Sequence, residues 1–246
     1  MPPSCSAMLE RFLQDLRTDD PGAETPAATR DRLKGRYAPG STRRMTLLGM
    51  LVGSTLGDLS AAADCTIVYA SSLGEGRALE DYLASFPCAS PTLFQTSIHP
   101  SGVQQGLIGR QQSVRELFPL AGGPQLVVQA LLTAMLVPGP VATLTGGEER
   151  GTWLVESGAV SDRSFAYAVR LAREPGPNPL GRLVLESEIA ATSPGLSNPV
   201  DEAPVPRADG IAGGALSHAA WFELLHHRRA LDGPVAAGWR LQLIWS

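Results

Sequence analysis

The sequence is poor in cysteine, and its three cysteines form no known motif. Cys5, Cys65 and Cys88 are odd in number and lack the close spacing of a metal site. This usage argues against a disulfide framework and is typical of a reducing compartment. Cys65 lies in the apolar run CTIVYA and is interpreted as a buried small residue, while none of the three has an evident base nearby in the sequence. We therefore expect no catalytic cysteine, no metal and no cofactor.

The chain also lacks a long apolar run and an excess of positive charge. No stretch reaches the roughly 18 to 20 apolar residues of a membrane span, and the opening MPPSCSAMLERFLQDLR lacks the apolar region of a signal peptide. The net charge is -4 and the 20 Lys and Arg residues are scattered, which gives no basic field for nucleic acid. The sequence contains no G-x-S-x-G elbow, Walker loop or G-x-G-x-x-G motif. We expect a cytoplasmic protein with no membrane span and no nucleic-acid partner.

What is present suits one well-buried core, because the 246 residues are 43% hydrophobic. Residues 1–40 are expected to form a loosely attached N-terminal arm and linker. They carry a short stretch with helical spacing followed by a Pro/Ala/Thr-rich connector. The apolar residues of that stretch are Met8, Leu9, Phe12, Leu13 and Leu16. Residues 41–246 are expected to form the folded domain.

Within residues 41–246, apolar β-rich runs alternate with stretches of helical periodicity. Such alternation indicates a layered α/β fold with a parallel or mixed sheet. The last hundred residues favour antiparallel strands, a Pro/Gly loop over 192–214 and one amphipathic helix over 215–233. The expected strands are 65–70, 112–120, 140–147, 164–172, 181–190 and 239–246. The other expected helices start near 42 and cover 76–86 and 123–136, and 90–109 is expected to be a turn followed by a helix with several glycines.

The segment FPLAGGPQLVVQALLTAML, from Phe118 to Leu136, predicts a strand, a tight turn and a helix that is apolar on nearly every side. Many enzymes keep a nucleophile at such a turn, because the first turn of the helix presents free backbone N–H groups. Here the turn consists of Ala121, Gly122 and Gly123, none of which can react. We expect the helix over 123–136 to be the most buried helix of the fold.

The order of four motifs resembles the N-terminal half of a ketosynthase of the thiolase fold. These motifs are IVYASSLGEG, SPTLFQTSIHPSGVQQGLIG, FPLAGGPQLVVQALLTAM and VATLTGGEE. In addition, SPTLFQTSIHPSG and TRRMTLLGM resemble short ketosynthase-like proteins of the chain length factor type in aryl polyene gene clusters. The likeness covers about residues 40–170. It implies an α/β, thiolase-like half-fold, with a layered mixed sheet and a buried central helix.

The resemblance also places candidate site residues. Gly122 stands where ketosynthases have their nucleophilic cysteine, and the second half of a ketosynthase, with its two histidines, has no counterpart. His99 matches a motif histidine of the short proteins, although Pro100 replaces the Asn that follows it there; a hydrogen-bonded loop residue is the simpler interpretation. The motif positions are His99, Ala121, Gly122, Gly123, Gly146, Gly147 and Glu148.

Other polar residues have simpler interpretations. Glu148 and Glu149 are assigned to a structural turn, because neither has a partner acid at a known spacing. His218, His226 and His227 are assigned to a solvated helix, since adjacent helical residues point in different directions and cannot share one ion.

Two functions follow from different classes. The first is a non-catalytic, chain length factor-like subunit that forms a heterodimer with a complete β-ketoacyl synthase in type II fatty acid or polyketide biosynthesis, with an acyl carrier protein as a further partner. Its interface would include Val114, Leu117 and Phe118 on the strand over 112–120. The alternative is an independent acyl-thioester enzyme that uses Ser71, Ser72 or His99.

Overall fold

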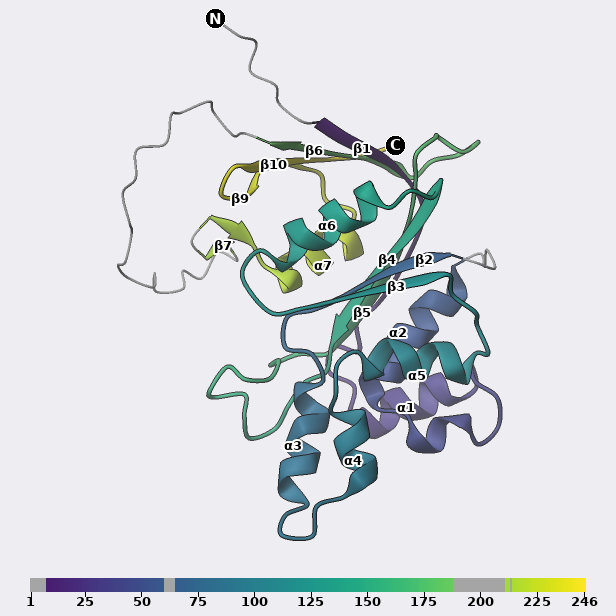
Figure 1. Cartoon of the computed structure of the whole chain (residues 1–246), viewed down its shortest axis with the longest axis vertical. Coiled ribbons are helices and arrows are strands. Elements are labelled where there is room, and N and C mark those ends of the chain that lie inside the picture. The colour runs from purple at the N-terminus through teal and green to yellow at the C-terminus, as the bar shows by residue number, and fades with distance from the viewer. Residues whose placement is uncertain (1–7, 60–64, 188–210, 213) are drawn as a thin grey trace, which may run out of the picture.

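An eight-stranded mixed sheet organises the part of the chain that the structure describes. The structure is a computed structural model, and it describes residues 8–59, 65–187, 211–212 and 214–246. The order across the sheet is β3-β2-β4-β5-β1-β6-β10-β9 (Figure 1). The strands are β1 (Met8–Asp19), β2 (Thr66–Ser71), β3 (Glu116–Ala121), β4 (Val141–Glu148), β5 (Phe165–Ala172), β6 (Gly181–Ser187), β9 (Leu231–Ala236) and β10 (Trp239–Trp245), with a separate ribbon of β7 (Ile211–Ala212) and β8 (Ala215–Leu216).

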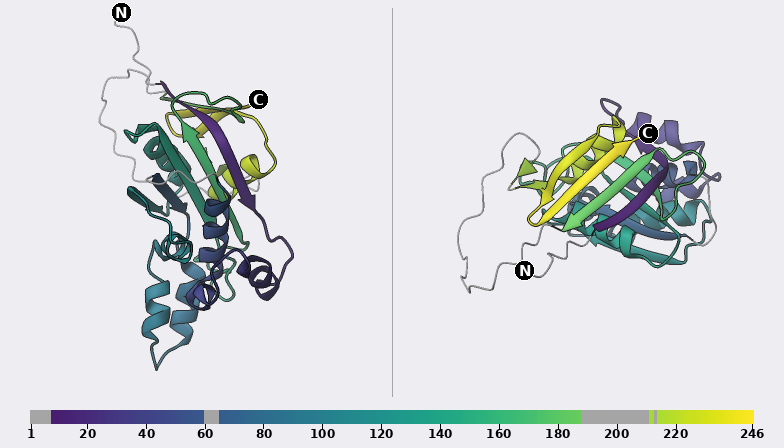
Figure 2. Two further views of the ribbon diagram at one scale, coloured as in Figure 1. Left: turned by 90° about the vertical axis from the view of Figure 1, so that its right-hand side faces the viewer. Right: turned by 90° about the horizontal axis from the view of Figure 1, so that it is seen from above.

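The first three strands in this order are parallel, and all later neighbours are antiparallel. Every residue of β2 is buried, as its apolar centre, IVYA, predicts for a strand covered on both faces. The right-hand view of Figure 2 shows β10, β6 and β1 side by side. The expected α/β class with a mixed sheet is confirmed.

Helices cover both faces of the sheet, which gives three layers (Figure 1). One apolar cluster joins the sheet to α6 and α7, and a second joins it to α1, α2 and α5. The helices are α1 (Pro26–Lys34), α2 (Leu47–Asp58), α3 (Gly76–Ala84), α4 (Pro91–Thr96), α5 (Ser101–Gly109), α6 (Leu126–Leu136) and α7 (His218–His226), with a 3-10 turn η1 at Ser41–Arg44.

The most buried of these helices is α2, so the expectation for the helix over 123–136 is wrong. Ten of the 12 residues of α2 are buried, against seven of 11 in α6, where Leu136 is 62% exposed. Gly53 of α2 meets Gly106 of α5 so closely that a Cβ at Gly53 would lie 2.6 Å from the Gly106 Cα. The glycines of α2 therefore allow a close helix crossing that a count of apolar residues does not reveal.

The first described segment is a strand, which contradicts the helical arm expected from its spacing. β1 lies inside the sheet, between β5 and β6. The register shifts between Leu13 and Asp15. This bulge adds one residue, so Leu13 and Leu16 both face the core although they are three positions apart. A bulged strand can thus imitate helical periodicity, and Met8–Asp19 is not a loosely attached arm.

Most other expected elements are confirmed, with shifted ends. The helix expected over 215–233 ends at His226, because Leu231–Ala236 forms the edge strand β9. The stretch 90–109 forms two helices, α4 and α5, and β3 begins only at Glu116. Most of the loop expected over 192–214 lies outside the described residues. Among the described residues, no helix combines the length and apolar character needed to cross a membrane.

Candidate functional site

The candidate residues from the sequence gather where the three parallel strands end. Gly122 follows β3, Ser72 follows β2, and Glu148 closes β4, and these strands are neighbours in the order β3-β2-β4. The carboxyl ends of parallel strands share one edge of a sheet. A crevice there, where the strand order reverses, is a common place for ligands.

The turn after β3 has no side chain that can react, and its backbone favours glycine. Gly122 and Gly123 have φ angles of 73° and 78°, in the left-handed region that L-residues adopt only with strain. The Gly122 N–H donates to the Ser71 carbonyl at 3.1 Å. A Cβ at Gly122 would meet only the Ser72 carbonyl, at 3.9 Å. The obstacle to a side chain here is therefore backbone conformation rather than space.

A buried network of three side chains fills the interior next to the end of β4. His218 Nδ1 lies 2.7 Å from Glu148 Oε1, and His218 Nε2 lies 3.1 Å from the Tyr167 hydroxyl. One assignment suits every atom: Nδ1–H donates to the carboxylate, and Nε2 accepts from the hydroxyl. Burial first, and then Glu148, raises the pKa of Tyr167 well above its usual range, so the hydroxyl keeps its proton. Both ring nitrogens of His218 are therefore already in use.

Glu148 also holds the end of β2. Its carboxylate accepts from the Ser72 N–H at 2.6 Å and from the Ser71 hydroxyl at 3.1 Å. Both Glu148 and His218 are buried, so the solvated position expected for His218 is wrong. Glu148 lies at the end of a strand rather than in a turn, and its contacts with the end of β2 are structural, as expected. Gly146 makes room for the network, because a Cβ there would lie 2.7 Å from the Tyr167 hydroxyl and 2.8 Å from His218 Nε2. Gly147 has its own constraint, since its Cβ would lie 2.6 Å from the Phe165 carbonyl.

His99 belongs to a second carboxylate–histidine pair on the other side of β2. Its Nδ1 lies 3.1 Å from Glu75 Oε2, and its ring stacks on Tyr69 with 5.2 Å between centroids. The other oxygen of Glu75 accepts from the Gly102 N–H at the start of α5, at 2.9 Å. Burial raises the pKa of Tyr69 well above its usual range. The simpler interpretation of His99, a hydrogen-bonded loop residue, agrees with this geometry.

Two further glutamates near this edge also bind backbone N–H groups. Glu149 accepts from Leu48 N at the start of α2, at 2.9 Å. Glu80, on α3, accepts from Thr152 N and Leu154 N at 2.8 and 2.7 Å. Burial opposes ionisation of Glu80, but these hydrogen bonds outweigh it and lower its pKa. The carboxylates around the edge thus hold the backbone, and none is left as a free base.

The remaining histidines and cysteines are not part of this edge. His226 and His227 are exposed at the end of α7, where His226 contacts Thr18 and His227 contacts Glu223. Cys65 is partly buried, which raises the pKa of its thiol, and Cys88 is exposed. Cys5 lies outside the described residues. Within the described ranges, no three His, Cys, Asp or Glu side chains are grouped so as to hold a metal ion.

The structure adds residues that the sequence did not single out. Tyr167, Tyr69 and Glu75 come from three separate segments, and only the fold brings them beside the motif residues. For His218 a signal was present. It follows Ser217, whose side chain accepts from Ala220 N as a helix cap, so His218 occupies the first turn of α7 rather than its solvated end.

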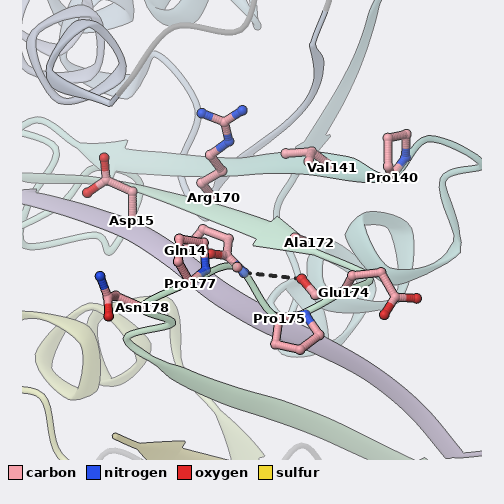
Figure 3. Close-up of a pocket in the computed structure, with 11 residues that line it drawn as sticks. Gln14, Asp15, Pro140, Val141, Arg170, Ala172, Glu174, Pro175, Pro177 and Asn178 are labelled. Carbon is pink, nitrogen blue, oxygen red and sulfur yellow. Dashed lines mark hydrogen bonds between the residues drawn. The ribbon is translucent and has the colours of Figure 1, made fainter.

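Cavities occur at both ends of the parallel strands. One of about 460 Å³ is lined by Ser72, Glu148, Phe165 and His218, beside the candidate site. Another, of about 520 Å³, lies at the opposite end of β4, near Pro140 and Val141 (Figure 3). There Gln14 donates to the Glu174 carbonyl at 3.2 Å, from β1 to the loop after β5. The strand length from Val141 to Glu148 separates this second cavity from the candidate site.

The residues expected at an interface lie on or just before β3, the edge strand of the sheet. Phe118 is 37% exposed. Val114 and Leu117 are partly buried and pack against the cluster that contains α2 and α5. The edge of β3 that faces away from β2 has no strand beside it in the part of the chain that the structure describes.

Comparison with known proteins identifies the fold. No protein-family profile and no curated protein sequence matches the chain. Among solved structures, a chain from the ketosynthase ApeO in complex with its chain length factor ApeC, from Xenorhabdus doucetiae, aligns over 97% of this chain and 99% of its own length, with a TM-score of 0.58 and 19% identity.

Two longer proteins align more weakly. PksG, an HMG-CoA synthase from Bacillus subtilis, has a TM-score of 0.35 and 11% identity, and the alignment covers 71% of this chain and 44% of PksG. A 3-oxoacyl-(acyl-carrier protein) synthase from Burkholderia xenovorans has a TM-score of 0.32 and 11% identity, and the alignment covers 74% of this chain and 54% of that protein. Scores this low carry no argument. The chain therefore shares its α/β fold, along nearly its whole length, with a component of a ketosynthase–chain length factor complex.

Proposed function

We propose that this protein is a non-catalytic, ketosynthase-like subunit of the chain length factor type. It pairs with a complete β-ketoacyl synthase in type II fatty acid or polyketide biosynthesis of the aryl polyene kind. It acts in the cytoplasm, needs no cofactor, and meets an acyl carrier protein as part of that assembly.

The chemistry of the parallel-strand edge is the observation that carries this proposal. The position that resembles the ketosynthase nucleophile is Gly122, in a backbone conformation that favours glycine. The nearby histidine, His218, has both ring nitrogens engaged by Glu148 and Tyr167. This end of the parallel strands is well packed but has no reactive group at the nucleophile position. Such an arrangement suits a subunit that shapes the active site of a partner.

The fold comparison supports the same assignment. The similar chain belongs to a complex between a ketosynthase and its chain length factor, and the two chains align over nearly their full lengths. We extend the pairing named for that complex to this chain.

The surface around β3 supports a partner on this side of the molecule. β3 is an edge strand, and an edge with unpaired N–H and C=O groups can add a strand from another chain. Helices α4 and α5 lie on the same side as β3 (Figures 1 and 2). Phe94 of α4, Ile98 of the link between the two helices and Ile108 of α5 are 49%, 48% and 76% exposed. We assign the interface to Val114, Leu117 and Phe118, with Phe118 as its most exposed side chain.

The alternative is an independent acyl-thioester enzyme, and its serines have no free base. Ser72 lines the cavity beside Glu148 and His218, but both ring nitrogens of His218 are engaged by Glu148 and Tyr167. Ser71 is fully buried and donates to Glu148. The His99 ring contacts Glu75 and Tyr69 rather than either serine. This geometry favours the partner function.

Two measurements test the proposal. Co-expression with a complete β-ketoacyl synthase whose gene lies beside its own should give a stable heterodimer by light scattering after gel filtration. The pure protein, incubated with acyl-carrier and acyl-CoA thioesters, should show no covalent acylation and no turnover by mass spectrometry. Failure to pair, or acylation of a serine or histidine, would contradict it.

A further inference from the structure

A cavity of about 520 Å³ lies between α1, α2, α3 and the segment that follows β4. It shares no lining residue with the cavity beside Glu148 and His218. Three arginines from three separate elements line it: Arg30 from α1, Arg77 from α3, and Arg150 just after β4. The proposed function uses none of them.

Two of these arginines make no direct ion pair among the described residues. Arg77 is neutralised locally, since it pairs with Asp81 at 2.7 Å and with the buried Glu80 at 3.3 Å. Arg30 donates to the Met45 carbonyl at 3.0 Å, and within the described ranges no carboxylate lies within 4.0 Å of it. Arg150 is exposed, and among the described residues no carboxylate lies within 4.0 Å of its guanidinium. Arg30 and Arg150 therefore bring positive charge to the lining without a direct ion pair, although Arg30 interacts electrostatically with Glu149.

Besides Asp81, which pairs with Arg77, the lining holds one acid, Glu149, whose charge burial opposes and Arg30 favours. Its carboxylate accepts from Leu48 N, but burial is the larger effect and raises its pKa. Glu149 thus binds a proton more readily than an exposed glutamate does, which weakens its opposition to an anion. Ser164, also in the lining, accepts from Arg150 N through its Oγ and keeps its O–H free to donate.

We propose that this cavity binds a phosphate ester, with its oxyanion held by Arg30 and Arg150 and by the Ser164 hydroxyl. Guanidinium groups that approach from different elements suit a tetrahedral anion with several acceptor oxygens better than a flat carboxylate, which one arginine can satisfy. The cavity is much larger than a phosphate group alone, so it has room for the organic part of an ester.

Calorimetric titration of the whole protein with glycerol 3-phosphate, at constant ionic strength, tests this site. We expect saturable binding of one molecule with a dissociation constant of about 1 mM or tighter. Arg150→Gln should weaken it by about tenfold or more, because it removes a charge-assisted contact from an exposed residue whose loss should leave the fold intact. Arg30→Gln should weaken it as well.

Two controls make the test specific. Arg229→Gln removes an exposed arginine beyond the end of α7, outside this cavity, and should leave the affinity unchanged. Glycerol without phosphate should not bind. Absence of saturable binding by glycerol 3-phosphate, or equal affinity in the wild type and the folded Arg150→Gln protein, would overturn the proposal.

Competition then identifies the source of the phosphate. An acyl carrier protein can be compared in its apo form and in its phosphopantetheinylated form, which adds a phosphodiester. If only the modified form displaces glycerol 3-phosphate, the ester is borne by the carrier. If neither form does, the ligand is a free ester. This result is independent of the proposed function, because heterodimer formation with the ketosynthase is measured separately.

Discussion

At the scale of single residues, Glu149 and Glu80 show how the same side chain can destabilise or stabilise the fold. Burial raises the pKa of Glu149, so its ionised form is costly in the folded protein. That cost appears as the pH rises above the pKa of the unfolded chain, near 4.3, and is absent when both states are protonated. Glu149→Gln keeps an acceptor for Leu48 N and removes the charge. We expect it to raise the free energy of unfolding by on the order of 1 kcal/mol at pH 7 to 8, with the gain lost toward pH 4.

Glu80 should behave in the opposite way. Hydrogen bonds from Thr152 and Leu154 lower its pKa despite burial, so its charge contributes stability above the unfolded pKa that is lost as the pH falls through the folded one. Glu80→Gln should therefore destabilise the protein by about 2 to 3 kcal/mol at pH 7 and by less in acid. Urea unfolding of both variants from pH 4 to 8 checks the pair. Parallel pH profiles for the two variants would contradict both assignments.

The Gly122→Cys variant tests whether a cysteine at the nucleophile position is enough to give condensing activity. The new side chain must adopt a left-handed φ near 73°, which should cost about 1 kcal/mol or more. Even when the thiol is presented, His218 is committed to Glu148 and Tyr167. We expect slow alkylation by iodoacetamide and no chain extension by mass spectrometry. Extension products from this variant alone would mean that another residue supplies the missing base.

The limits of sequence reasoning are also clearest at this scale. The glycine turn and Glu148 could be placed at one edge of the sheet because each follows or ends an apolar β-rich run, and such runs can be recognised in the sequence. The partners of Glu148 could not be predicted, because His218 and Tyr167 lie 70 and 19 positions further along the chain. Burial of His218 depends on which way α7 docks, and that is decided by the assembled sheet rather than by local pattern.

At the scale of elements, β1 and α6 are tied together by a buried arginine. Arg11 is 1% exposed, and its guanidinium donates to the carbonyls of Met135 and Val137 at 2.7 and 3.1 Å, where α6 ends. A cation suits the negative end of a helix dipole and the unpaired carbonyls there. Burial first, and then Arg173, lowers the pKa of Arg11. The first described strand is thus a support of the central helix.

We expect Arg11→Met to destabilise the protein by about 2 to 4 kcal/mol, because it leaves buried carbonyls without donors. Arg182→Met provides a matched control, since Arg182 lies on the adjacent strand β6 and is paired with Glu10 near the surface. Its loss should cost no more than about 1 kcal/mol. Denaturant unfolding of both proteins checks the difference. Equal stabilities would show that the α6 carbonyls find other donors.

The same elements show why the fold was only partly predictable. β2 and β4 are short apolar runs bounded by turn residues, and they appear where the sequence predicts. β1 was missed because a single bulged residue converts strand alternation into a spacing of three. α2 is more buried than α6 because its glycines allow α5 to pack at close range. A pattern of hydrophobic residues does not indicate which helix will have such a neighbour.

At the scale of the whole molecule, the sheet has two ends, and they differ in how well they are protected. β9 ends the sheet with a sequence, LDGPVA, in which Asp232 and Pro234 discourage pairing. β3 also contains a proline, Pro119, but it exposes Phe118. If another chain adds to this sheet, β3 is the end that offers both backbone groups and apolar area.

Phe118→Asp should therefore disrupt the proposed heterodimer and leave the isolated subunit folded. A charge placed at a desolvated contact costs several kcal/mol, enough to lower a heterodimer affinity by about a hundredfold or more. Ile244→Asp is the matched control, because Ile244 is 42% exposed on β10, toward the other end of the sheet. Light scattering after gel filtration with the ketosynthase, at a fixed protein concentration, distinguishes the two. If Phe118→Asp leaves the heterodimer intact while Ile244→Asp breaks it, the partner binds at the β9 end, and the proposed position of this subunit must be reversed.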